Sequence, residues 1–212
     1  MNYQEKQIKN ILKKFNSGQT REALVELSNL IQTKPAKLEY HFIYGQMCSQ
    51  ANNLDEAEKV FLFLLNKNKN SLEYLTNLYI VYLKKGNFIE SEKYILKVLK
   101  INNNNYGALR DLGYLKFLKK NYQEAKIIFE KIQVKMDKDV FAINIYGLIN
   151  LFTENLDKAI SLFTKAIKLD PNYIDSYNNL GKVFFDQEDL EKAFNNFKKA
   201  YKLNKEFPNT LI

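Results

Sequence analysis

The sequence has few of the residues that interrupt helices and few of those that carry most enzyme chemistry. Its 212 residues include 3 Pro and 7 Gly, with one Cys, one His and no Trp. Because a single cysteine has no partner within the chain, an intrachain disulfide is excluded, which fits a reducing compartment. So few prolines and glycines over this length favour helices joined by short turns.

Long apolar runs are also absent. No stretch of 18 consecutive apolar residues occurs, so the sequence predicts no transmembrane helix. The first residues, MNYQEKQIKNILKKF, contain no extended apolar segment of the kind found in signal peptides. We therefore expect a cytoplasmic protein, although a leader removed before this sequence begins would leave no trace. Apolar residues still make up 46% of the chain, which is enough to build a core.

Arginine is scarce although the chain is basic. The net charge of +8 permits contact with nucleic acid or with another acidic surface. However, the 32 basic residues include only two arginines, Arg21 and Arg110. Proteins that read nucleic acid favour Arg for its forked donor geometry. The composition therefore argues against nucleic acid as the main partner.

What the sequence does contain is a repeat with a period of 34 residues. Three series of identical residues recur at this interval: Ala125, Ala159 and Ala193; Phe129, Phe163 and Phe197; Gly113, Gly147 and Gly181. The register continues to the N-terminus without an insertion. It defines six repeats: 4–37, 38–71, 72–105, 106–139, 140–173 and 174–207. A constant period of this length is typical of solenoid architectures.

This pattern resembles the tetratricopeptide repeat family. The sixth repeat carries its signature most fully: Tyr177, Leu180, Gly181, Phe184, Ala193, Phe197 and Ala200. Repeat three departs from it with Tyr79 and Ser91 in place of the small residues, and Lys205 replaces the final Pro. The resemblance implies an all-α fold, an α-solenoid of six helix–turn–helix repeats that form a right-handed superhelix. It would be a single domain over 4–207, followed by a short tail, 208–212.

Each predicted repeat has an internal packing face. Positions 4, 7, 8 and 11 of the first helix share one side at 100° per residue, and they face positions 20, 24 and 27 of the second helix. Gly at position 8 and Ala at position 20 have little bulk. We therefore expect the two helices of a repeat to approach closely at these positions.

Motifs for catalysis, metal binding or cofactor binding are missing. No Gly-rich phosphate loop, HExxH, CxxC or calcium-loop spacing occurs. His41 and Cys48 are seven residues apart on one predicted helix face, so a Cys–His pair is conceivable, but core packing accounts for both. We predict no catalytic residues, no metal and no cofactor, and hence a protein that is not an enzyme.

A second face of the first helices is the candidate partner-binding groove. In the family that the sequence resembles, positions 2, 5, 9, 12 and 13 of these helices line the concave surface. The candidate residues are Phe42, Arg110, Tyr114, Phe117, Phe141, Asn144, Leu148, Phe152 and Phe185. In repeats four and five this face is apolar. Either successive first helices cover it, which is easiest at positions 9 and 12, or a ligand does.

Two further features of the repeats bear on partners. Glu5, Glu39 and Glu73 share position 2 and would form an acidic rim, although carboxylates in a first turn also simply stabilise the helix dipole. At the other end, Phe194 and Tyr201 would normally pack on a following helix. This predicts self-association through the C-terminal repeat, docking of a partner, or a continuation of the array.

The sequence therefore favours a scaffold that binds an apolar or amphipathic segment of another protein in its groove. The first alternative is a structural subunit that stacks end to end in a larger complex. The second is binding of RNA or an acidic surface through Lys-rich faces. A basic clamp for acidic chaperone tails is not expected: from repeat two onward its five positions read Phe42, Gln46, Asn77, Gly107 and Asp111.

Overall fold

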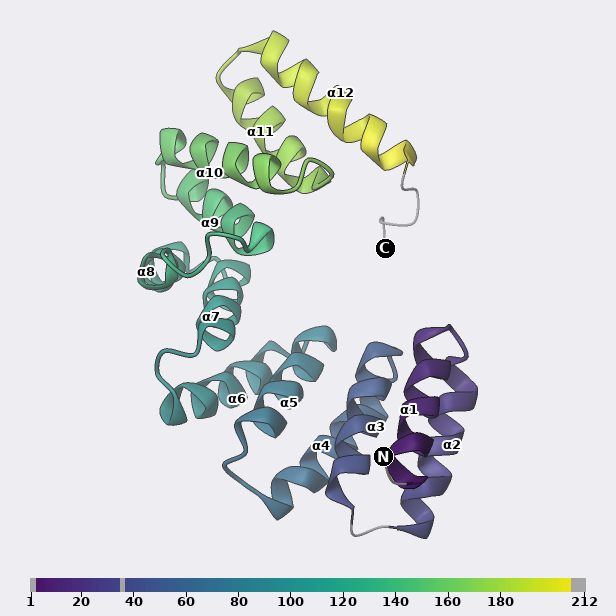
Figure 1. Ribbon diagram of the computed structural model, residues 1–212. Helices are drawn as coiled ribbons and strands as arrows, with labels where there is room; N and C mark the ends of the chain where they lie inside the picture. Colours follow the sequence, from purple (N-terminus) through teal and green to yellow (C-terminus); the bar gives the residue numbers. More distant parts are fainter. Residues whose placement is uncertain (1–2, 35–36, 207–212) are drawn as a thin grey trace. The chain divides into compact units, whose positions relative to one another are not determined.

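The computed structural model describes residues 3–34 and 37–206, and these residues form twelve α-helices and no strand (Figure 1). The predicted all-α fold is confirmed. The helices are α1 (Tyr3–Asn16), α2 (Thr20–Thr33), α3 (Leu38–Gln50), α4 (Leu54–Lys67), α5 (Leu72–Lys84), α6 (Phe88–Ile101), α7 (Tyr106–Leu118), α8 (Tyr122–Ile132), α9 (Val140–Phe152), α10 (Leu156–Leu169), α11 (Ile174–Asp186) and α12 (Leu190–Glu206). The expected tail, 208–212, lies outside the described residues.

The helices fall into two compact units, Met1–Ala108 and Leu109–Ile212. In the first unit, α1 to α6 pack in chain order, each against the next; in the second, α8 to α12 do the same. Helices α3, α5, α7, α9 and α11 begin at residues 38, 72, 106, 140 and 174, which are the predicted repeat starts. This spacing is consistent with six repeats, while the single domain over 4–207 stays a prediction. Within the described part of the chain, no helix is both long and apolar enough to cross a membrane.

The turn inside each repeat has one construction throughout the chain. Three residues separate the two helices of every pair, and the middle one has a positive φ. These middle residues are Gly18, Asn52, Gly86, Lys120, Glu154 and Glu188. The N–H of the third turn residue donates to a carbonyl five residues earlier, as Asn155 does to Asn150 at 2.8 Å. This bond satisfies a carbonyl that the end of the helix would leave free.

The glycine at position 8 makes room for an aromatic ring, not only for a neighbouring backbone. A Cβ added to Gly147 would lie 2.5 Å from Cε1 of Phe163, and one added to Gly181 would lie 2.8 Å from Cε1 of Phe197. Gly45 and Gly113 stand in the same relation to the phenylalanines of their own repeats. The expected close approach is therefore a contact of glycine with the ring at position 24.

Where the glycine is missing, the phenylalanine is missing too. Repeat one has Ile11 and Leu27 at these two positions, and both side chains are buried in the core of its unit. Repeat three has Tyr79 and Ile95, also buried. There the hydroxyl of Ser91, at the usual alanine position, donates to the carbonyl oxygen of Tyr79 at 3.0 Å. These repeats fill the same space with a different division of volume between the two helices.

Candidate partner-binding surface

Aromatic side chains from α7, α8 and α9 gather in the second unit. Tyr114 and Phe117 are three residues apart on α7, and Phe141 and Phe152 are eleven residues apart on α9, so each pair shares a helix face. Tyr122 is the first residue of α8. We call these five residues the α7–α9 aromatic surface. It contains four of the residues that the sequence predicted.

Three of the rings form one cluster. Tyr122 and Phe152 stack with centroids 4.7 Å apart and an interplanar angle of 9°, and Phe117 lies 5.7 Å from Tyr122 and 5.9 Å from Phe152. Phe152 remains 49% exposed. A hollow of about 280 Å³ adjoins it, lined by Lys120, Asn121, Tyr122, Gln123, Glu124 and Phe152. The cluster thus holds its rings rigidly and still offers apolar surface to solvent.

The other two rings lie beside Arg110. Tyr114 and Phe141 meet edge to face, with centroids 5.2 Å apart. The Arg110 guanidinium lies 5.9 Å from the centroid of Phe141 and donates hydrogen bonds to Asp111 at 2.8 Å and to Asp139 at 3.1 Å. Asp139 also accepts a hydrogen bond from the backbone N–H of Ala142 and so caps α9.

These contacts decide the electrostatic character of this end of the surface. Burial acts to lower the pKa of the Arg110 guanidinium, but the hydrogen bonds and negative charges of Asp111 and Asp139 outweigh it and raise the pKa. The arginine is thus balanced by two carboxylates of the protein itself. It orients Phe141 and the start of α9, and it offers little net charge to an anionic ligand.

Two of the remaining predicted residues mainly join α9 to α11. Asn144 is only 2% exposed, and its side-chain oxygen accepts hydrogen bonds from Ser176 Oγ at 2.9 Å and from Asn179 Nδ2 at 3.1 Å. Leu148 is half-buried against the cluster that contains Leu180 and Val183. Packing between successive first helices therefore uses positions 5 and 9 of repeat five.

The last two predicted residues lie apart from the aromatic surface. Phe185 is 59% exposed on α11. Phe42 belongs to the first unit, where it is half-buried and contacts Phe61 and Tyr74 with centroids 6.2 and 5.5 Å away. Sequence reasoning missed Tyr122, which starts a second helix. A signal for it exists, because the same position holds a bulky apolar residue in every repeat after the first: Leu54, Phe88, Tyr122, Leu156 and Leu190.

His41 and Cys48 each have their own surroundings. The His41 ring stacks on Phe63 with centroids 4.9 Å apart, and its Nδ1 lies 3.1 Å from the carbonyl oxygen of Lys37. Cys48 is wholly buried. Seven residues along a helix separate the two by about 10 Å. Among the described residues, no group of three or more His, Cys, Asp or Glu side chains could hold a metal ion.

The Cys48 thiol should be unreactive in the native protein. Burial raises its pKa to about 11, and a hydrogen bond with Tyr44 offsets this only in part. At pH 8 we expect a disulfide thiol reagent to modify Cys48 far more slowly in the native chain than in denaturant, since the thiolate is the reacting species. Complete modification of the folded protein within the mixing time would contradict this.

The same pKa shift has a consequence for stability. Since the ordinary thiol pKa is 9.0, the folded state keeps a proton between pH 9 and about 11 that the unfolded state loses, so stability should fall as the pH rises through this range. The Cys48→Ala variant should show a shallower fall. The pH dependence of stability that remains in this variant comes from buried tyrosines such as Tyr44. Burial raises the pKa of Tyr44 to about 12.

Lysines lie in the same hollow as part of the predicted acidic rim. Glu5, Glu39 and Glu73 all lie in the first turns of their helices, where carboxylates stabilise the helix dipole. Glu5 and Glu39 line one hollow of about 360 Å³ together with Lys9 and Lys37. The rim is therefore of mixed charge in this place, and the helix-dipole interpretation is sufficient.

Family models for this type of repeat match part of the chain. The family described as "TPR repeat" matches residues 153–188, and the family described as "Tetratricopeptide repeat" matches residues 80–105 and 174–207. No curated protein sequence matches the chain.

Several solved structures share the fold. MamA 41-end from Desulfovibrio magneticus RS-1 is 25% identical, with 81% of this chain and 97% of that chain covered and a TM-score of 0.71. A tetratricopeptide repeat protein from Parabacteroides merdae is 20% identical, with 93% and 78% covered and a TM-score of 0.77. YrrB, titled "a TPR protein with an unusual peptide-binding site", is 19% identical, with 87% and 94% covered and a TM-score of 0.64. The likeness to the last two concerns the fold alone.

Proposed function

We propose that this chain, whose residues 80–105 and 153–207 match tetratricopeptide repeat models, is a protein-interaction scaffold. It would bind an apolar or amphipathic segment of another protein on the α7–α9 aromatic surface. The observation that carries the proposal is the stacked pair Tyr122 and Phe152, in which Phe152 stays half exposed and both rings line a hollow of about 280 Å³. Aromatic anchors of this kind dominate binding energies, because they bury a large area with few rotatable bonds.

The chemistry of the surface supports an apolar segment over an acidic one. The arginine beside the surface, Arg110, is already paired with Asp111 and Asp139. An approaching carboxylate would have to compete with two that are fixed by the fold, whereas an apolar side chain can enter beside Phe152 without breaking an ion pair. An amphipathic helix, with one apolar face and the other in solvent, meets this requirement.

The proposal predicts that ring truncations weaken binding without unfolding the protein. Phe152→Ala and Tyr114→Ala should each raise the Kd by about 30-fold, equivalent to about 2 kcal/mol. The fold should survive because Phe152 is half exposed. The measurement is to capture the partner with the wild-type chain, map the bound segment to a peptide, and titrate that peptide against each variant at two salt concentrations.

A matched control comes from the first unit. Leu96 is 51% exposed on α6, close to the exposure of Phe152, so Leu96→Ala removes a similar side chain from another surface and should leave the Kd unchanged. If the aromatic variants stay folded and bind normally while added salt abolishes binding, the Lys-rich faces bind the partner instead, since phosphate contacts weaken steeply with salt.

A further inference from the structure

One face of α12 carries an apolar stripe that remains largely exposed among the described residues. Leu190, Phe194, Phe197 and Tyr201 are 63%, 64%, 39% and 59% exposed. Their spacing of four, three and four residues places them on one side of the helix. We call these four residues the α12 stripe. Four large apolar side chains in one row form a contiguous patch, unlike the single exposed apolar residues that are normal on protein surfaces.

Two of the four positions, those of Phe197 and Tyr201, hold buried side chains in internal repeats, whereas Leu156, the counterpart of Leu190 in repeat five, is itself 39% exposed. At the position of Phe197, Phe61, Phe129 and Phe163 are fully buried. At the position of Tyr201, Leu65 is 8% exposed. Inside the array the next first helix packs on this face, as α5 does on α4 and α11 does on α10. Phe197 and Tyr201 therefore hold positions that pack against a following helix at the α4–α5 and α10–α11 interfaces.

The surroundings of the stripe are positively charged. Helix α12 contains five lysines and two glutamates. Lys198 Nζ lies 5.6 Å from the centroid of Phe194, and Lys205 Nζ lies 4.9 Å from the centroid of Tyr201. Two ammonium groups thus stay at the margin of the exposed rings. A helix that docks on the stripe would meet these charges at its own flanks.

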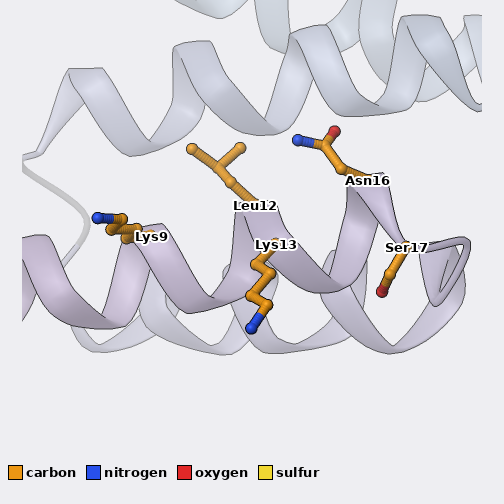
Figure 2. Close-up of a pocket in the computed structure, with 5 residues that line it drawn as sticks. All are labelled: Lys9, Leu12, Lys13, Asn16 and Ser17. Carbon is orange, nitrogen blue, oxygen red and sulfur yellow. The ribbon is translucent and has the colours of Figure 1, made fainter.

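This charge argues against a second copy as the occupant. Two α12 stripes placed face to face would bring lysines against lysines. Docking on α1 of another copy is no better: its open side forms a hollow of about 460 Å³ lined by Lys9, Leu12, Lys13, Asn16 and Ser17 (Figure 2). Leu12 is the one apolar side chain in that lining, and two lysines flank it. Like charges at both interfaces oppose association.

We propose that the α12 stripe is a second docking surface, distinct from the α7–α9 aromatic surface, and that it binds an amphipathic helix of another protein with acidic residues beside its apolar row. The apolar row supplies contact area, and the acidic flanks pair with Lys198 and Lys205. The scaffold would then hold two segments at separate places in its second unit.

The test uses two synthetic helical peptides with leucines at i, i+4, i+7 and i+11. One has glutamates at the flanking positions and the other has lysines. Fluorescence anisotropy with the full chain should show that the Glu peptide binds. The Lys peptide should bind at least about tenfold more weakly. The Phe194→Ser/Tyr201→Ser variant should bind the Glu peptide about tenfold more weakly, and should keep its helical circular dichroism because both side chains are exposed.

The Phe152→Ala variant separates this proposal from the proposed function. It should bind the Glu peptide like the wild type, because Phe152 lies on the other surface. Loss of binding in this variant alone would place the peptide on the α7–α9 aromatic surface and overturn the α12 proposal. Equal binding of both peptides, or no binding of either, would also overturn it. So would a dimer in sedimentation that the Phe194→Ser/Tyr201→Ser variant dissolves, since a second copy would then occupy the stripe.

Discussion

Replacing Phe163 with alanine is expected to lower the free energy of unfolding by about 3–5 kcal/mol, as truncation of a buried phenylalanine does. The ring is fully buried and packs in the cluster formed with Ala159, Leu180 and Val183. It also occupies the space over Gly147, so its removal leaves a cavity that a backbone without a side chain cannot fill. Urea denaturation followed by circular dichroism would measure the loss.

Phe197 provides the matched control, because it has the same position in repeat six and packs over Gly181 in the same way. It is 39% exposed, where Phe163 is fully buried. Phe197→Ala should therefore cost clearly less, since a smaller area returns to water. Equal losses in the two variants would mean that the difference in coverage between α10 and α12 is absent in solution.

Gly147→Ala should destabilise the protein by about 1–2 kcal/mol, even though alanine is the better helix former. The new Cβ would lie 2.5 and 2.8 Å from two ring carbons of Phe163. Neither partner can move easily, because both are fully packed in the interior. The overpacking cost should then exceed the gain of about 1 kcal/mol in helix propensity. Denaturant unfolding again measures it.

Two variants test whether steric overlap of the new Cβ with the Phe163 ring causes the loss of stability in Gly147→Ala. Gly107→Ala adds a Cβ whose nearest neighbours would lie at 3.7 and 3.8 Å, so it should be neutral or slightly stabilising. Gly147→Ala combined with Phe163→Leu should cost less than the sum of the single variants. Strict additivity would show that the glycine does not make room for the ring.

The sequence predicted the helices well because the repeat gives six independent readings of one pattern. A constant register of 34 residues locates the turns even in repeats that lack glycine there, such as the turn with Lys120. The alternation of small and large residues located the core positions, including Ala159 and Phe163. The pairing of a given glycine with a given ring needs the distance between two helices, and periodicity along one helix does not supply it.

The candidate site was less predictable for the same physical reason. Helix periodicity placed Asn144 on the groove face, but its hydrogen-bond partners, Ser176 and Asn179, come from the next repeat. Arg110 pairs over 29 residues with Asp139, the last residue of repeat four, which caps the first helix of repeat five. Contacts of this range depend on how one helix pair stacks on the next, which no single repeat encodes.

The three-residue turns also restrict how such a chain can vary in length. In each turn the left-handed middle residue and the hydrogen bond that follows it set the direction of the second helix. One inserted residue would rotate that helix by about 100° relative to its partner and turn its buried alanine and phenylalanine towards solvent. Substitutions at exposed positions leave the stacking intact, but a change in length preserves it only when a whole unit of 34 residues is gained or lost. The array can therefore be expected to have grown by duplication of complete helix pairs.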